Sequence, residues 1–160
     1  GIGSAPVPFD EIDPQIFTSV METNVTGAFL CSQQAWALMK VTGGRIINNG
    51  SISAHSPRPL SAPYTMAKHA MTGLTKSLNL DGRAYNISCS QIDIGNAETL
   101  MTQRLATVGA LQPNGTIVTE PLMSVDVVAN TIVYLANLPL NVNVPFMTIM
   151  AAQMPFMGRG

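Results

Sequence analysis

The sequence has few charged residues and little cysteine. Of its 160 residues, 8 are Lys or Arg and 9 are Asp or Glu, which gives a net charge of -1 with no basic cluster. A small, dispersed charge of this kind disfavours nucleic acid as a partner. Cys31 and Cys89 match no zinc or redox spacing, so the sequence predicts no metal site. Because each cysteine stands in an apolar stretch, we expect two buried thiols in a reducing compartment.

Long apolar runs and targeting segments are also missing. No apolar run approaches the roughly 20 residues that a membrane-spanning helix needs. The first residues lack the basic start and apolar core of a signal peptide. Ala5 stands where a myristoylation signal requires Ser or Thr. The sequence therefore predicts no membrane contact and a cytoplasmic location.

The chain does have the apolar content of a globular protein. Hydrophobic residues make up 46% of the sequence, which excludes a disordered composition. A chain of 160 residues is long enough for one domain with a core and short for two. We expect a single domain over residues 1–160.

Predicted helices and strands alternate along the chain. Asp13 followed by Pro14 is typical of a helix start, and the pattern indicates a long helix to Met39, bent near Val25–Gly27. The remaining expected elements are strands near 45–49, 85–95 and 144–151, and helices near 62–84, 98–106 and 124–138. This order favours an α/β fold with a parallel sheet and right-handed crossovers. Three strands are few for such a sheet, so the fold looks like part of a larger one.

Tyr64 and Lys68 form the most informative pair of residues. Four positions apart at the start of a predicted helix, they share one face. A phenol titrates near 10, and a neighbouring ammonium favours the phenolate, so we expect Lys68 to lower the Tyr64 pKa. Ser51 follows the strand "RIINN", at the sheet edge where ligands gather in open α/β folds. Together they suit proton transfer to and from a carbonyl oxygen.

The segment "IINNGSISAHSPRPLSAPYTMAKHAMTGLTKSL" resembles the active-site segment of the short-chain dehydrogenase/reductase family. The resemblance rests on a strand, a serine, a tyrosine thirteen residues later and a lysine four after that. It implies that Tyr64 is the general acid–base, that Ser51 orients the substrate carbonyl and that Lys68 binds the nicotinamide ribose. Ser53 is the alternative to Ser51, although its spacing is two residues short.

Two flanking motifs extend the resemblance. "NVTGAF" matches the family asparagine, so Asn24 is implied to hold a water in a proton relay. "IDIGNAET" matches the family turn after the next strand, with Ile94 in place of the usual proline. The implied contacts to NAD or NADP are made by Tyr64, Lys68 and three residues of this turn: Ile94, Gly95 and Thr99. A helix N-cap is an equally good interpretation of Thr99.

Other residues near this site have open interpretations. The loop 96–120 corresponds to the family's variable substrate lid. Its apolar residues suit either an apolar substrate wall or ordinary packing; they are Leu100, Met101, Leu105, Val108 and Leu111. His55 lies in the loop over the site, where a substrate contact is open to it, but for both His55 and His69 the sequence favours a plain surface or packing role.

The glycine-rich loop that binds the cofactor pyrophosphate in this family has no counterpart in the chain. "GIGSAP" instead resembles the tail of the turn after the family's fourth strand. We therefore expect a Rossmann-like doubly wound parallel sheet that is N-terminally truncated, with an exposed strand edge. The implied activity is NAD(P)-dependent oxidoreduction of a small alcohol or carbonyl, in a homo-oligomer formed through the two long helices. The alternatives are an inactive remnant that serves as an oligomerisation or interaction module, and a fragment active only when complemented.

Overall fold

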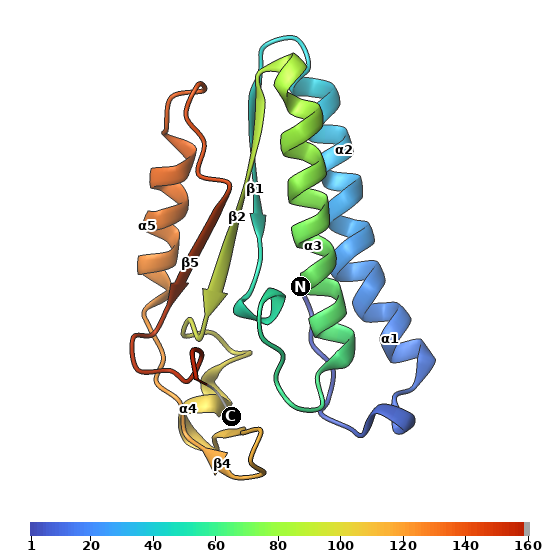
Figure 1. Ribbon diagram of the computed structural model, residues 1–160, viewed down its shortest axis with the longest axis vertical. Helices are drawn as coiled ribbons and strands as arrows, with labels where there is room; N and C mark the ends of the chain where they lie inside the picture. The colour runs from blue at the N-terminus through green and yellow to red at the C-terminus, as the bar shows by residue number, and fades with distance from the viewer. Residues whose placement is uncertain (159–160) are drawn as a thin grey trace.

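A computed structural model describes residues 1–158 and places three parallel strands at the centre of the fold (Figure 1). The strands are β1 (Gly44–Asn49), β2 (Ile87–Gly95) and β5 (Phe146–Met150), in the order β1-β2-β5. β2 pairs in parallel with both neighbours, and β1 lies at one edge of this sheet. The three-stranded parallel sheet and its exposed β1 edge agree with the sequence expectation.

The first long helix is interrupted where its sequence is least helical. The Asp13 carboxylate accepts a 2.8 Å hydrogen bond from the Gln15 amide and so caps α1 (Pro14–Met21). A single π-helical turn, Glu22–Thr26, then leads into α2 (Gly27–Met39). The predicted bend is thus a π turn, an irregularity that is frequent at functional sites.

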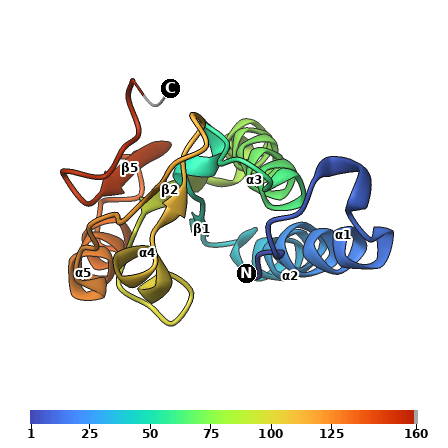
Figure 2. The ribbon, with the colours of Figure 1, turned by 90° about the horizontal axis from the view of Figure 1, so that it is seen from below.

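Helices cover both faces of the sheet. α3 (Ala62–Asp81) lies against one face with α1 and α2 beside it, and α5 (Val125–Ala136) lies against the other (Figure 2). The Ser124 hydroxyl caps α5 by accepting a 3.2 Å hydrogen bond from the Asp126 amide. This helix–sheet–helix layering is the predicted Rossmann-like arrangement.

Side chains alternate between the two faces along β2. Ile92 belongs to an apolar cluster with Ala97 and Val128, on the side of α5. Gln91, one position earlier, points to the opposite side and donates a 3.1 Å hydrogen bond to Thr72 on α3. One strand therefore contributes to an apolar face and to a polar face.

The segment after β2 contains more structure than the sequence indicated. It forms α4 (Gln103–Thr107) and a small antiparallel hairpin of β3 (Ala110–Leu111) and β4 (Ile117–Val118). Two-residue strands give too short a periodic pattern to be recognised.

The expectation of two buried thiols is wrong for one of them. Cys89 is buried, but Cys31 is exposed on α2. The apolar residues around Cys31 do not face the sheet, since Phe29 and Leu30 are themselves about half exposed, at 49% and 50%. Among residues 1–158, no helix is both long and apolar enough to cross a membrane.

Candidate active site

The carboxyl end of β1 and the first turns of α3 form the candidate active site. Ser51 follows directly after β1 and Gly50, whose amide donates a 2.8 Å hydrogen bond to the Ile92 carbonyl. Tyr64 lies in the first turn of α3, and Lys68 lies one turn further along. The strand end and the helix start thus bring the three predicted residues together.

The Ser51 side chain lies beside that of Tyr64, close enough to lower the pKa of the phenol. Lys68 is buried, with its Nζ 5.5 Å from the Tyr64 ring centroid, and donates a 2.9 Å hydrogen bond to the Asn49 carbonyl. Burial raises the pKa of Tyr64, and the Ser51 side chain partly offsets this. Burial likewise lowers the pKa of Lys68, while the charge of Asp93 opposes that shift.

The direction of the Tyr64 shift corrects the sequence expectation. We expected the Lys68 ammonium to lower the Tyr64 pKa, but the net shift in the folded chain is upward. The reason is that removing the phenol from water penalises the phenolate, and this penalty outweighs the favourable interactions. Tyr64 is therefore protonated at neutral pH in this state.

Ser53 lies next to this arrangement but not within it. Its backbone amide donates a 3.1 Å hydrogen bond to the Ser51 hydroxyl oxygen. Ser51, and not Ser53, is the serine whose side chain acts on the pKa of Tyr64. The geometry therefore favours Ser51 for the substrate contact, and the Ser53 amide helps to hold the Ser51 hydroxyl in position.

Asn24 lies in the π turn and holds the N-terminal segment. Its Oδ1 accepts a 2.8 Å hydrogen bond from the Ile2 amide, and its Nδ2 donates a 2.7 Å hydrogen bond to the Ile2 carbonyl. A Cβ on Gly1 would lie 2.7 Å from the same Oδ1, so this position has room only for glycine. Both polar atoms of the Asn24 side chain are thus engaged within the chain.

The predicted cofactor-contact residues lie at the end of β2. Gly95 is packed closely, since a Cβ there would come within 2.7 Å of the Met154 sulfur. Thr99 is exposed, and its hydroxyl lies 3.1 Å from the Thr102 hydroxyl. Thr99 is not a helix N-cap, because α4 begins at Gln103 with Thr102 in the N-cap position.

Sequence analysis missed a buried carboxylate beside this site. Asp93, on β2, is fully buried, and its Oδ2 lies 2.7 Å from Nε2 of His55. Its Oδ1 accepts hydrogen bonds from the Ser51 amide, at 3.0 Å, and from Gln91 Nε2, at 2.8 Å. His55 therefore has a specific buried partner, which the sequence did not indicate. The signal was an acidic residue in an otherwise apolar strand, "ISCSQIDIG".

A second buried carboxylate joins the loop before α3 to the segment after β2. Arg58 Nη1 and Nη2 donate to Glu120 Oε1 and Oε2 at 2.7 and 2.6 Å. Asn96 and Gln112 add hydrogen bonds of 2.8 and 2.9 Å to the same carboxylate. Burial by itself would raise the pKa of Glu120, but these hydrogen bonds lower it to about 2. The predicted lid is thus anchored at one end by a permanent cation.

The apolar residues of this lid segment are only partly packed. Leu100, Met101 and Val108 are 91%, 58% and 58% exposed. Ordinary core packing therefore does not explain these three. They remain available for an apolar substrate wall, as the sequence suggested.

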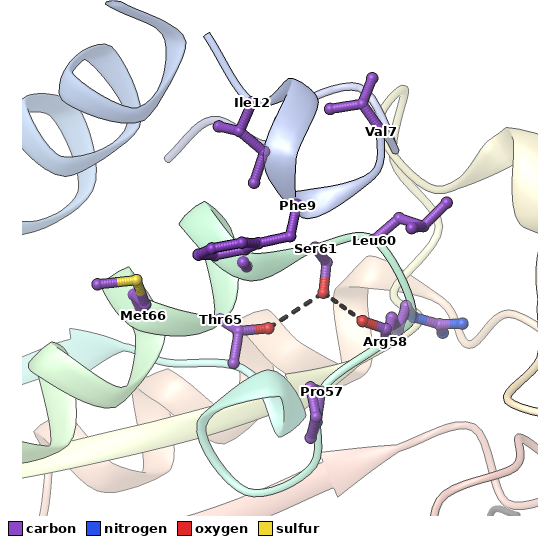
Figure 3. Close-up of a pocket in the computed structure, with 10 residues that line it drawn as sticks. Val7, Phe9, Ile12, Pro57, Arg58, Leu60, Ser61, Thr65 and Met66 are labelled. Carbon is purple, nitrogen blue, oxygen red and sulfur yellow. Dashed lines mark hydrogen bonds between the residues drawn. The ribbon is translucent and has the colours of Figure 1, made fainter. Parts of the chain in front are cut away.

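A pocket of about 320 Å³ lies beside the site, between the N-terminal segment and the start of α3. In Figure 3 the Phe9 side chain lies close to Thr65 at one side of this pocket. Ser61 is hydrogen-bonded to the Arg58 carbonyl and to the Thr65 hydroxyl, at 2.7 and 3.1 Å. The lining is mainly apolar, and Tyr64, Ser51 and Lys68 are not part of it. The pocket therefore lies beside the candidate active site and is not lined by its three residues.

Comparisons with known proteins define the family. A family model described as "short chain dehydrogenase" matches residues 1–108. A 3beta-hydroxysteroid dehydrogenase of Mediterraneibacter gnavus is 31% identical over 65% of this chain, and a 3alpha-hydroxysteroid dehydrogenase of the same organism is 33% identical over 84%. The solved structure of ElxO with NADP bound is 25% identical to this chain, with a TM-score of 0.79. The match covers 94% of this chain and 62% of the ElxO chain.

This chain belongs to the short-chain dehydrogenase family. Its relatives are named as dehydrogenases and reductases, so the family is one of enzymes. The chain spans 38% of the length of the first steroid dehydrogenase and 54% of the second. The matched region contains Ser51, Tyr64 and Lys68, the residues that the geometry brings together.

Proposed function

We propose that this chain forms the catalytic part of an NAD(P)-dependent oxidoreductase acting on an alcohol or carbonyl. The observation that carries the proposal is the grouping of Ser51, Tyr64 and the buried Lys68, whose ammonium lies 5.5 Å from the Tyr64 ring centroid. Family membership supports it, as does the NADP bound in the ElxO structure.

In the direction of reduction, Tyr64 donates its phenolic proton to the substrate carbonyl oxygen. The Ser51 hydroxyl binds the same oxygen and fixes its position. A reduced nicotinamide supplies the hydride that the carbonyl carbon accepts. The Lys68 ammonium then stabilises the phenolate that Tyr64 becomes. The raised pKa of Tyr64 suits this direction, because the phenol must carry its proton at the start.

We assign the nicotinamide riboside end of the cofactor to Tyr64, Lys68 and the turn Ile94–Thr99. Lys68 fits a ribose, since only one of its three ammonium donors has a hydrogen-bond acceptor among residues 1–158, the Asn49 carbonyl. Residues 1–158 contain no glycine-rich strand–helix loop to fit the pyrophosphate. The expected affinity of this chain for the whole cofactor is therefore low.

In this scheme Asn24 contributes to the proton relay through its main chain and not through its side chain. Because both side-chain polar atoms bind Ile2, a relay water would bind its main-chain carbonyl. The π turn is consistent with this, since π-helical turns displace the regular pattern of main-chain hydrogen bonds.

We further infer that the long helices mediate self-association. Several large apolar side chains on α1, α2 and α3 are at least about half exposed: Ile16, Phe29, Leu30, Leu38, Met66 and Leu80. Exposed apolar side chains gathered on adjacent helices are typical of protein–protein contacts. The same surface favours the alternative function, an inactive interaction module. The cytoplasmic location stays a prediction of the sequence.

Calorimetric titration with NADH and NADPH tests the proposal against this alternative. Lys68→Met removes the ribose contact, and Lys76→Met, an exposed lysine on the same helix, is the matched control. We expect saturable binding with a dissociation constant on the order of 1 mM, which Lys68→Met abolishes and Lys76→Met preserves. Binding that is absent from the wild-type chain would favour the interaction module, and binding that survives Lys68→Met would refute the site.

A further inference from the structure

Asp93 and His55 form a hydrogen-bonded pair that the proposed mechanism does not use. The Asp93 side chain is fully buried, whereas the His55 side chain is 44% exposed. A buried carboxylate is unfavourable unless its charge is compensated by donors. Here the donors are the Ser51 amide, the Gln91 amide nitrogen and the His55 imidazole.

The partners of His55 determine which of its nitrogens carries a proton. An ionised carboxylate only accepts hydrogen bonds, so Nε2 of His55 must be the protonated nitrogen. In the neutral imidazole, Nδ1 is then left with a lone pair and acts as an acceptor. No hydrogen bond to Nδ1 is found among residues 1–158. The exposed part of the ring therefore presents an acceptor.

This acceptor lies next to the catalytic group. One carboxylate binds the Ser51 amide through Oδ1 and His55 through Oδ2, which keeps the imidazole close to Ser51. The Ser51 side chain in turn lies beside Tyr64. The packing around the carboxylate is tight, because a Cβ on Gly50 would lie 2.0 Å from Asp93 Oδ1. The Phe156 ring, 6.3 Å from the imidazole centroid, meets it edge-on and limits its rotation.

We propose that His55, held by Asp93, determines substrate specificity by accepting a hydrogen bond from a second hydroxyl group of the substrate. The reacting oxygen binds between Tyr64 and Ser51, and the group on the adjacent carbon reaches Nδ1 of His55. The preferred substrates are thus hydroxyketones and the corresponding diols, in preference to simple ketones and alcohols. Asp93 is a positioning residue that fixes the tautomer and orientation of His55. This inference rests on the proposed function for the location of the reacting oxygen.

The test uses the imidazole of the full 160-residue chain as the reporter, and it requires no turnover. Nitrogen-15 NMR of His55 gives the tautomer directly, and hydroxyacetone is added as the probe with acetone as its matched control. We expect protonated Nε2 and a saturable change at Nδ1 with hydroxyacetone but not with acetone. His69→Gln, an exposed histidine on α3, should leave this response unchanged.

Two variants distinguish the proposed His55–substrate hydrogen bond from the positioning of His55 by Asp93. His55→Gln should weaken hydroxyacetone binding about tenfold, the effect of losing one hydrogen bond of about 1.4 kcal/mol. Asp93→Asn should abolish the Nε2–H preference. A protonated Nδ1, an equal response to both probes or no response to either would each overturn the inference. Because tautomer and probe binding are read without cofactor, absence of oxidoreductase activity would refute the proposed function separately.

Discussion

On the α5 side of the sheet, Ile92 packs against Val128 and Ala97. On the α3 side, the side-chain amide of Gln91 forms hydrogen bonds with Thr72, Thr75 and Asp93. The apolar side needs only shape and volume, because dispersion and burial are not directional. The polar side needs each donor matched with an acceptor, since an unmatched buried group is costly. The polar side also leads to Ser51 through Asp93, so the directional face is the one that carries the site.

The largest expected effect is on the apolar face. Ile92→Ala removes a fully buried side chain and should lower the free energy of unfolding by about 4 kcal/mol. The Tyr64 and His55 resonances should not change, because the substitution lies on the opposite face. Urea unfolding followed by circular dichroism measures the loss, with the exposed Val133→Ala as control. A loss below about 1 kcal/mol would mean that this cluster is not the core.

Lowering the pH should reduce the stability contributed by the Arg58–Glu120 ion pair and leave that of the apolar face unchanged. The folded-state pKa of Glu120 is lowered from 4.5 to about 2, so its contribution is complete above pH 4.5 and is lost as pH falls towards 2. At about 1.4 kcal/mol for each pKa unit, this lowering amounts to roughly 3.5 kcal/mol. The unfolding free energies of wild type and Glu120→Gln should therefore differ most near pH 6 and converge near pH 2.

An exposed carboxylate provides the control for this titration. Glu98→Gln should run parallel to the wild type across the same range, because Glu98 is exposed. Parallel curves for Glu120→Gln as well would show that the Arg58 ion pair does not compensate the buried charge.

A neutral change on the polar face should have a smaller effect. Gln91→Met keeps the volume but leaves Asp93 short of one donor and removes partners of Thr72 and Thr75. We expect a loss of about 2 kcal/mol, together with altered His55 resonances. The same unfolding and NMR measurements apply. Unchanged stability with unchanged His55 signals would show that the hydrogen bonds from Gln91 through Asp93 to His55 do not form a continuous network.

The smallest effect concerns the two thiols. Cys89 lies on the polar face, and burial raises its thiol pKa to about 11, whereas Cys31 is exposed. A thiol reagent should therefore label Cys31 quickly and Cys89 at least about 100-fold more slowly, through opening of the fold. Cys31→Ser should abolish the fast phase, and a fast phase that persists would place Cys89 at the surface.

The sequence predicted the parts of the fold that rest on local periodicity and caps. Asp13 and Ser124 cap helices as expected, and the three strands pair in parallel. The pairing of Tyr64 with Lys68 followed from helical spacing, and the resemblance to the family's active-site segment added Ser51 at the strand end. The hairpin of β3 and β4 was missed, since its strands are only two residues long.

What spacing could not give were contacts between distant segments. His55 and Asp93 are 38 residues apart, and Arg58 and Glu120 are 62 apart. Nothing in the local sequence of either histidine told them apart, yet one binds a buried carboxylate and the other lies exposed on α3. The net pKa of Tyr64 was missed for a related reason, because burial depends on the whole fold.

In the proposed site, the carboxyl end of the sheet would hold only the nicotinamide end of the cofactor. The most direct test compares NADH with reduced nicotinamide mononucleotide, which lacks the adenosine half, by amide NMR of the wild-type chain. We predict that both shift the same signals, those of Ser51, Tyr64 and Gly95, with dissociation constants that agree within about threefold. Binding of NADH more than about tenfold tighter, or shifts located elsewhere, would contradict this account.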